Sequence, residues 1–283
     1  MKIAHVLLVH KNPQQIVRLI KRLAHPDVDC WVHIDRKFDT PAFRQVLSSE
    51  NIFYVTPNIN VEWGCYNTVE AMLLGMQHII AAKENYDYIT FLSGQDYVLQ
   101  PTAVFLNYLK ANDGLEFIGI QPCEVSIDNI IRLKKYHFND YSFFGKNLLE
   151  RFINKISPYR KFPYPYEVKK GPQWLTITKN AATYIVDFVA KNPRYVNYFR
   201  KVHIPDEFFF QTILFNSEFK HKIKDGVFHY TDWSENKAHP RLLTINDKQN
   251  ILASDYFFSR KFDATIDATI LDLIDKEKLA LVS

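Results

Sequence analysis

The sequence of 283 residues contains little glycine and none of the glycine-rich loops that cradle phosphates. Its eight glycines form neither the GxGxxG pattern of dinucleotide-binding folds nor the GxxxxGK[ST] pattern of P-loop proteins, which argues against both classes. No run of 18 or more apolar residues exists, so no transmembrane helix is expected. Residues 1–10 lack the basic, apolar and small-residue pattern of a secretory signal.

Cysteine is equally scarce. Cys30, Cys65 and Cys123 are scattered and form no CxxC pair, so we expect no disulfide framework, no zinc site and a reducing, cytoplasmic compartment. One DxD pattern, at residues 27–29, has the ligand chemistry of a Mg²⁺ or Mn²⁺ site. It precedes a predicted strand and would lie at the wrong end of the sheet. We therefore expect no metal and no other cofactor.

Charge is also limited. A formal net charge of +4 is too weak to predict nucleic-acid binding, and an RNA-binding alternative would depend only on the basic, tyrosine-rich stretch 132–170. The charge does fit an anionic ligand or peripheral contact with an acidic membrane surface. No GxSxG elbow is present, which argues against a serine hydrolase.

What the sequence does contain is an alternation of short apolar runs and amphipathic helices over its first 120 residues. Short β-branched runs predict strands, and apolar residues at helical spacing predict helices between them. This order predicts an α/β fold with a parallel sheet and right-handed crossovers. The predicted strands are 3–9, 30–35, 52–55, 88–92 and 116–120, and the helices are 13–23, 43–47, 68–82 and 102–109.

The rest of the chain is less regular. Residues 124–170 predict helical pieces followed by an ordered loop, because the stretch is too aromatic for a disordered linker. Residues 171–177 predict a turn and a strand, and residues 180–190 an amphipathic helix. A late strand is predicted at 227–231 and a final helix at 269–280.

Polar residues follow two of the predicted strands. In open α/β sheets, ligands bind at the carboxyl ends of the strands, so these residues are the first site candidates. They are His33, Asp35, Lys37, Ser93, Gln95 and Asp96.

The stretch 204–214 places Asp206 and Glu207 directly after Pro205 and before an apolar run. Pro205 suits a helix start, and acids in a first turn interact favourably with the helix dipole. The residues alone leave two interpretations open. One is an N-capped core helix, and the other is a catalytic base, Glu207, partly desolvated by the three phenylalanines that follow.

Cations gather in the C-terminal loops, where Arg241, Arg260 and Lys261 occur. Guanidinium groups match phosphate oxygens in bidentate fashion, and lysine adds a point charge. A solvated basic face is the alternative. If these cations converge on a diphosphate, they would stabilise the charge of a leaving group without a metal.

Seven motifs in order resemble the core-2/I-branching β-1,6-N-acetylglucosaminyltransferase and peptide O-xylosyltransferase family (glycosyltransferase family 14). They run through nearly the whole chain. They are Val32-His33-Ile34-Asp35-Arg36-Lys37, Glu62-Trp63-Gly64, Leu92-Ser93-Gly94-Gln95-Asp96-Tyr97, Gly171-Pro172-Gln173-Trp174, Pro205-Asp206-Glu207, Asp232-Trp233 and Arg260-Lys261-Phe262-Asp263.

The resemblance implies a GT-A fold, in which a Rossmann-like, mostly parallel central sheet is flanked by helices. It divides one catalytic domain into a nucleotide-sugar half, 1–122, and an acceptor half with the diphosphate-binding segment, 123–283. By motif position Glu207 would be the catalytic base, and Arg241, Lys261 and Arg260 would bind the diphosphate. The implied donor-binding residues are His33, Asp35, Lys37, Trp63, Gly64, Gln95 and Asp96, and the implied acceptor-binding residues are Trp233, Gln173, Trp174 and Arg132.

The activity implied is metal-independent, inverting transfer of a sugar from a UDP-sugar to a glycan hydroxyl. We expect UDP-N-acetylglucosamine as donor and a β-1,6 linkage, with UDP-xylose as the alternative. Unlike in animal members, we expect no anchor, stem or disulfide set here. We therefore expect a compact bacterial member in the cytoplasm, peripheral at the inner membrane face, acting in surface polysaccharide biosynthesis. A non-catalytic glycan- or nucleotide-binding relative is the alternative from another class.

Overall fold

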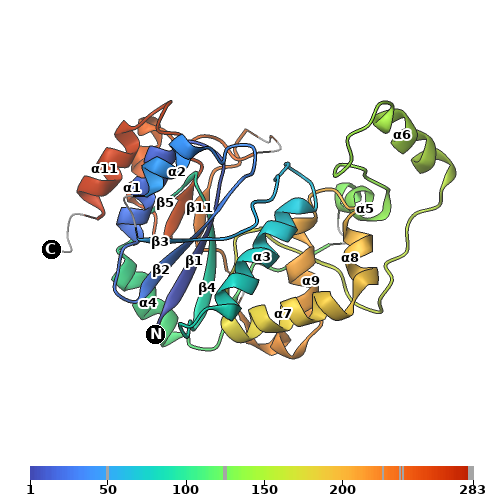
Figure 1. Ribbon diagram of the computed structural model, residues 1–283, viewed down its shortest axis with the longest axis horizontal. Coiled ribbons are helices and arrows are strands. Elements are labelled where there is room, and N and C mark those ends of the chain that lie inside the picture. The colour runs from blue at the N-terminus through green and yellow to red at the C-terminus, as the bar shows by residue number, and fades with distance from the viewer. Residues whose placement is uncertain (49–50, 124–125, 225, 236, 238, 280–283) are drawn as a thin grey trace. The chain divides into compact units, whose positions relative to one another are not determined.

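A computed structural model of the protein describes residues 1–48, 51–123, 126–224, 226–235, 237 and 239–279 (Figure 1). The chain forms two compact units that are interleaved in sequence. The first unit contains residues 1–58, 84–114 and 227–283, and the second contains residues 59–83 and 115–226. These units differ from the consecutive halves expected from the resemblance, so the division at residue 122 stays a prediction.

The first unit is built on four parallel strands in the order β4-β1-β2-β3, which Figure 1 shows side by side. Every residue of β1 is buried, as expected of a parallel strand covered on both faces. The register pairs Ile3 with Val28 on one side and with Tyr88 on the other. The bounds are β1 Ile3–Val9, β2 Val28–Ile34, β3 Ile52–Tyr54 and β4 Tyr88–Ser93.

Helices and a second, three-stranded sheet complete this unit. In the small sheet β12 lies between β11, to which it is parallel, and β5, to which it is antiparallel. The strands are β5 Asp96–Val98, β11 His229–Thr231 and β12 Phe258–Arg260. The helices are α1 Pro13–Leu23, α2 Pro41–Leu47, α4 Thr102–Ala111, α10 Lys248–Leu252 and α11 Thr269–Glu277, with a 3-10 turn at Ile245–Asp247.

The second unit is mainly helical and has only short strands. In it β6 is parallel to β10 and antiparallel to β9, and β7 pairs with β8 in antiparallel fashion. The strands are β6 Glu116–Phe117, β7 Gln121–Pro122, β8 Lys169–Lys170, β9 Thr176–Thr178 and β10 Ile223–Lys224. The helices are α3 Asn67–Ala81, α5 Ile127–Lys134, α6 Lys146–Ile156, α7 Lys179–Lys191, α8 Pro193–Phe199 and α9 Phe209–Phe215, with 3-10 turns at Pro205–Glu207 and Glu218–Lys222.

Aromatic side chains form the core of the second unit. Tyr195 is fully buried, and its ring centroid lies 4.7 Å from that of Phe199 and 5.0 Å from that of Phe209. Its hydroxyl donates to the Phe209 carbonyl oxygen at 2.7 Å, so its one polar group is satisfied. Part of the 15% aromatic content of the sequence therefore serves packing.

The α/β class and the mostly parallel sheet predicted from the sequence are confirmed. The helices predicted at 68–82 and 180–190 match α3 and α7 within two residues at each end. Strands β5 and β12 are additions to the prediction. The final helix is described to Glu277, and Ala280, where its predicted span ended, lies outside the described residues. None of the described helices combines the length and apolarity needed to cross a bilayer.

Candidate active site

The residues before Glu207 fix its position through an unusual backbone. Ile204 has φ 54° and ψ 60°, a left-handed conformation that is strained for a β-branched residue. Pro205 then begins a single 3-10 turn that ends at Glu207. The prediction of one continuous helix from Pro205 was wrong, because Phe208, with φ −126°, interrupts it before α9. Glu207 thus lies at a break between two elements, and Asp206 beside it is buried.

The Glu207 carboxylate is held from one side by two cations. Nη2 of Arg132 donates to its Oε2 at 2.8 Å, and Nζ of Lys170 lies 3.6 Å from the same oxygen. The side chain remains 26% exposed. Among the described residues no group hydrogen-bonds to the other oxygen, Oε1. The carboxylate is therefore oriented through Oε2 alone.

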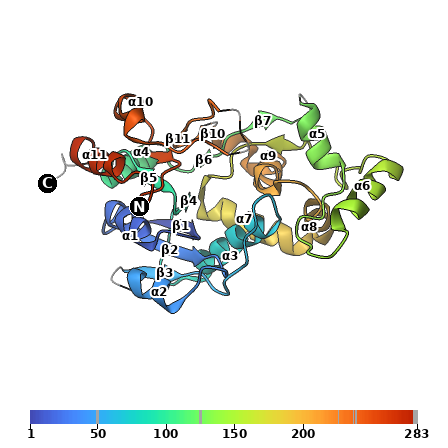
Figure 2. The same cartoon turned by 90° about the horizontal axis from the view of Figure 1, so that it is seen from above.

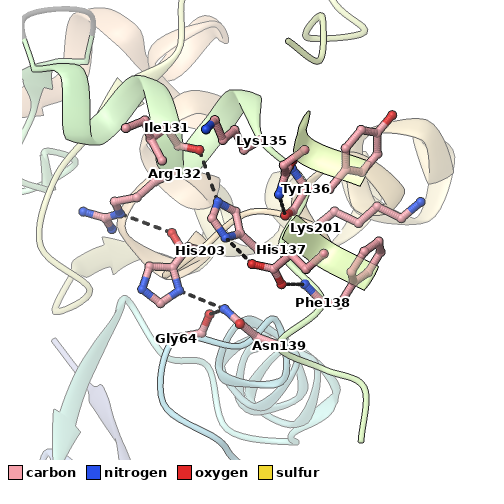
Figure 3. A network of polar contacts seen from close by, with 12 residues as sticks. Gly64, Ile131, Arg132, Lys135, Tyr136, His137, Phe138, Asn139, Lys201 and His203 are labelled. Atoms are coloured by element: carbon pink, nitrogen blue, oxygen red, sulfur yellow. Dashed lines mark hydrogen bonds and ion pairs between the residues drawn. The ribbon is translucent and has the colours of Figure 1, made fainter. Parts of the chain in front are cut away.

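Arg132 also anchors the backbone just before Glu207, and Figure 3 shows its contact with His203. Its Nε donates to the His203 carbonyl oxygen at 3.3 Å and its Nη2 to the Ile204 carbonyl oxygen at 3.4 Å. Its guanidinium carbon lies 4.8 Å from the ring centroid of Phe208. Because the Arg132 side chain is only 9% exposed, these contacts are shielded from water. Arg132, predicted to bind the acceptor, touches the predicted base itself.

Two predicted site motifs flank the same turn. The Gly64 carbonyl oxygen accepts from the Ile204 N–H at 3.0 Å. It also accepts from Asn139 Nδ2 at 3.2 Å, and both residues are labelled in Figure 3. The Gly171 N–H donates to the Glu207 carbonyl oxygen at 2.8 Å. A Cβ on Gly171 would lie 1.8 Å from the Gly119 carbonyl oxygen, so only glycine fits there.

Side chains beside these glycines also belong to the second unit. The Trp63 indole packs edge-on against His203, with ring centroids 5.5 Å apart, and remains exposed. Gln173 Nε2 lies 3.8 Å from the Met72 sulfur, and Trp174 is half-buried. Trp63 and Gly64, expected to contact the donor, thus share a unit with Glu207 rather than with His33, Asp35 and Lys37.

In the first unit, cations gather where strands end. Lys37 follows β2, and its Nζ lies 3.7 Å from Asp35 Oδ2. Lys261 follows β12 and forms no ion pair with any carboxylate of the described residues. Burial, followed by the charges of Arg260 and Lys11, lowers the pKa of Lys261. An anion bound here would relieve this mutual repulsion of cations.

Asp96 organises the residues behind that cluster. It is fully buried, and its carboxylate accepts from the Ser93 backbone N–H at 2.7 Å and from Ser93 Oγ at 2.6 Å. Arg260 Nε lies 3.2 Å from Oδ1, and His229 Nε2 lies 3.3 Å from Oδ2. Burial opposes ionisation, but Arg260, His229 and Ser93 outweigh it and lower the pKa of Asp96. Because both of its oxygens have partners, the Asp96 carboxylate is fixed and in turn positions the Arg260 side chain.

Two more predicted donor residues are buried near strand ends of the first unit. Gln95 accepts at its carbonyl oxygen from the Phe262 N–H at 2.8 Å, which ties β5 to the segment after Lys261. His33 lies within β2, and burial lowers its pKa to about 4 despite the opposing charge of Asp35. Both residues therefore support the fold around the cationic cluster.

Arg241 differs from Lys261 because its charge is already balanced. Its Nε lies 3.2 Å from Asp232 Oδ2, and its Nη1 lies 3.1 Å from Asp247 Oδ2. Two carboxylates thus surround one guanidinium. The pKa of Asp232 is lowered to about 2, first by hydrogen bonds from Ser234 and then by Arg241. Trp233, the predicted acceptor platform, follows Asp232 and is half exposed.

Sequence reasoning missed three cationic or titratable groups near Lys261. Lys11 Nζ forms an ion pair with Asp263 at 2.5 Å. Burial lowers the pKa of His10, and the charges of Lys11 and Lys261 lower it further. The pKa of His239 is lowered by burial and then by Lys261 and Arg260. The strand-end rule could have found His10 and Lys11, because they directly follow β1.

One carboxylate of the DxD pattern has other partners. Asp29 accepts from the Tyr86 hydroxyl at 2.7 Å and lies 2.8 Å from Lys2 Nζ. Within the described part of the chain, no three His, Cys, Asp or Glu side chains group as metal ligands would.

Comparisons with known proteins place the chain in a family. The family model described as Core-2/I-Branching enzyme matches residues 3–253, which include Glu207 and Arg241 but not Lys261. Xylosyltransferase oxt of Drosophila pseudoobscura pseudoobscura is 23% identical over 304 residues, covering 95% of this chain and 32% of that protein. Xylosyltransferase 2 of Rattus norvegicus is 23% identical over 307 residues, covering 97% and 33%.

The chain thus spans about a third of the length of these curated relatives. Among solved structures, apo mouse xyloside xylosyltransferase 1 is 10% identical with a TM-score of 0.44, covering 91% of this chain and 97% of that one. That similarity is too low to carry an argument. The family match extends over most of the chain, and so the chain belongs to the Core-2/I-Branching enzyme family.

Proposed function

We propose that the protein is a glycosyltransferase that moves a sugar from a UDP-sugar to a glycan hydroxyl with inversion, without a metal, and with Glu207 as general base. The observation that carries this proposal is the Glu207 carboxylate, fixed at Oε2 by Arg132 and Lys170 and open at Oε1. It lies within the part of the chain that matches the family model.

In the proposed reaction, Glu207 Oε1 accepts the proton of the acceptor hydroxyl. The acceptor oxygen attacks the anomeric carbon of an α-linked donor, and the bond from that carbon to the diphosphate oxygen breaks. UDP departs with the bonding electrons, and the new linkage is β. A base held in one orientation reduces the entropy cost of aligning the hydroxyl.

The charge of the departing diphosphate needs a counter-charge. Lys261 is the best-supported residue for this role, because it forms no ion pair among the described residues and the charges of Arg260 and Lys11 act on it. Arg241 would contribute only if UDP displaced one of its two carboxylates. We therefore propose Lys261 as the principal diphosphate ligand and Arg241 as the residue that orders the loop after β11.

Two donors remain candidates. The β-1,6-N-acetylglucosaminyltransferase resemblance favours UDP-N-acetylglucosamine. The similarity to proteins named xylosyltransferases favours UDP-xylose as the second candidate. For the acceptor we propose a bacterial surface glycan such as lipopolysaccharide or capsule. The proposed place of action is the cytoplasm, which the three free, buried cysteines support.

A donor assay tests the function. We expect UDP release from one of the two donors when the protein is incubated with that UDP-sugar, and stimulation of release by a sugar acceptor. Release should persist in excess EDTA, because protein cations rather than a metal would stabilise the leaving group. Loss of release in EDTA would contradict metal independence, whereas no turnover of any UDP-sugar would favour a non-catalytic binding protein.

Replacing Lys261 by methionine should weaken UDP binding by about tenfold to a hundredfold, the usual range for losing a charge-assisted contact. Methionine retains the apolar stem of this half-buried side chain. Isothermal titration calorimetry with UDP would measure the change. Lys276→Met, on an exposed lysine of the same unit, is the matched control. An unchanged Kd for Lys261→Met would remove Lys261 from the diphosphate site.

A further inference from the structure

Helix α6 is attached to the second unit by its polar side. Asn154 accepts from the Tyr136 N–H at 2.8 Å and donates to the Tyr136 carbonyl oxygen at 2.7 Å. Glu150 accepts from the Phe138 N–H at 2.9 Å, and its other oxygen lies 3.7 Å from His137 Nδ1. In Figures 1 and 2, α6 lies at the outer end of its unit, next to α5 and α8.

The apolar side of α6 consequently faces outward. Leu148, Phe152 and Ile156 recur every four residues and are 73%, 59% and 65% exposed. No residue of α6 is buried. More large apolar side chains adjoin the stripe and are also exposed, namely Phe143, Phe144, Leu149 and Tyr159. A helix of an ordinary globular protein buries this face instead, and a patch of this kind marks an interaction surface.

Basic residues border the apolar stripe. Arg151 and Lys155 are exposed and lie three residues after Leu148 and Phe152, on the adjoining edge of the helix. Residues 143–161 contain five basic residues and one acidic residue. Two of these six face inward: Arg160, which donates to the Lys201 carbonyl oxygen, and the acidic Glu150. The outward face therefore combines aromatic and aliphatic side chains with unopposed positive charge.

This combination defines the partner by its chemistry. A helix of 11 residues is about 16 Å long and is too short to span a hydrocarbon core of roughly 30 Å. Phe, Leu and Ile on one face with Lys and Arg at its edge suit a helix lying in the plane of a membrane interface. Anionic headgroups complement the positive border, whereas a second copy of the same face would bring like charges together.

We propose that α6, together with Phe143 and Phe144, inserts into the surface of an anionic lipid bilayer and docks the protein there. This surface includes neither Glu207 nor Lys261, so the membrane proposal can be tested independently of the proposed catalysis. The hydrogen bonds of Glu150 and Asn154 hold the helix in this orientation in the absence of lipid.

The first test measures co-sedimentation of the full chain with vesicles of phosphatidylcholine alone or with phosphatidylglycerol added. Binding should require the anionic lipid. The variant Leu148→Gln/Phe152→Gln/Ile156→Gln should lower the partition coefficient at least about tenfold, because burial of each such side chain favours the bound state by that order. Ile266→Gln, at an apolar residue 63% exposed in the first unit, is the matched control and should bind like wild type.

The charged border gives an independent result. Arg151→Gln/Lys155→Gln should weaken binding to anionic vesicles by about tenfold or more, since each cation near such a surface contributes on the order of a fivefold change. The same variant should show a shallower dependence on salt. Equal binding of wild type to neutral and anionic vesicles would overturn the assignment of the partner.

A probe on the helix reports insertion directly. Leu148→Cys can be labelled with an environment-sensitive fluorophore, because the three native cysteines are buried. Its emission should shift to the blue on adding anionic vesicles, and that of labelled Ile266→Cys should not. No shift, or a concentration-dependent dimer that the triple variant abolishes, would overturn the proposal; the dimer would assign the face to a second copy.

Discussion

Replacing Glu207 by glutamine is expected to lower the rate of sugar transfer by about 10²–10⁴-fold, the usual loss when a general base is removed. Glutamine has the same size and keeps an oxygen for Arg132, so the 3-10 turn should persist. It cannot take the proton of the acceptor hydroxyl. UDP release in the presence of acceptor measures the rate, and calorimetry with UDP should give a Kd close to that of wild type.

The matched control for this variant is Glu167→Gln. Glu167 belongs to the same unit, is 62% exposed and pairs with Lys169, so the same chemical change is made away from the turn. Its turnover should equal that of wild type. Turnover of Glu207→Gln within a few-fold of wild type would exclude Glu207 as the base. If Glu207→Gln also lost affinity for UDP, its lower rate would instead reflect a misfolded site.

Replacing Asp96 by alanine should produce the largest loss of stability. The substitution leaves Arg260 beside a buried gap and removes the acceptor for both Ser93 donors. Breaking a buried ion pair from one side costs about 3–5 kcal/mol of the free energy of unfolding. Urea denaturation would measure it. Asp96→Asn, which retains an oxygen for Ser93, should lose less.

The stabilisation that the Asp96 carboxylate provides should decrease as the pH falls. Because the folded pKa of Asp96 is below its unfolded value, its stabilisation is complete above about pH 4, the unfolded carboxyl range. It is lost as the pH falls through the folded pKa. The difference in free energy of unfolding between wild type and Asp96→Ala should therefore be constant from neutral to mildly acidic pH. It should disappear only in strong acid.

A surface ion pair provides the control for stability. Asp272 pairs with Arg18 and is 67% exposed. Replacing it by alanine should lower the free energy of unfolding by less than about 1 kcal/mol. A loss at Asp96 no larger than this would contradict the view that its carboxylate organises the strand ends.

The parts of the fold that periodicity controls were predictable from sequence. The buried run Ile3–Val9 and the amphipathic helix α3 were readable because burial imposes a period on the side chains. Strands β5 and β12 were not, because each has three residues and exists through pairing with a partner remote in sequence. The break at Phe208 was also hidden, since Asp206, Glu207 and the following phenylalanines read as one helix start.

The residue types that form the site were predictable from sequence. The contacts between their side chains were not. The strand-end rule placed Asp35 and Lys37 beside the cluster that contains Lys261. It could not show that Arg241 is balanced by two carboxylates or that Arg132 holds Glu207, because both depend on contacts across loops. The outward apolar face of α6 was hidden for the same reason: its amphipathic pattern alone predicts a helix packed by that face.

The pairing of β12 with β5 also has a consequence for how the protein is made. Asp96 emerges from the ribosome well before His229 and Arg260, its two basic partners, because more than 100 residues separate them. The second unit is complete at residue 226, before either basic partner is synthesised. The second unit can begin to fold first, while Asp96 still lacks both of its basic partners. Contacts this distant in sequence slow folding, so nascent chains stalled before residue 258 should remain sensitive to protease in the first unit.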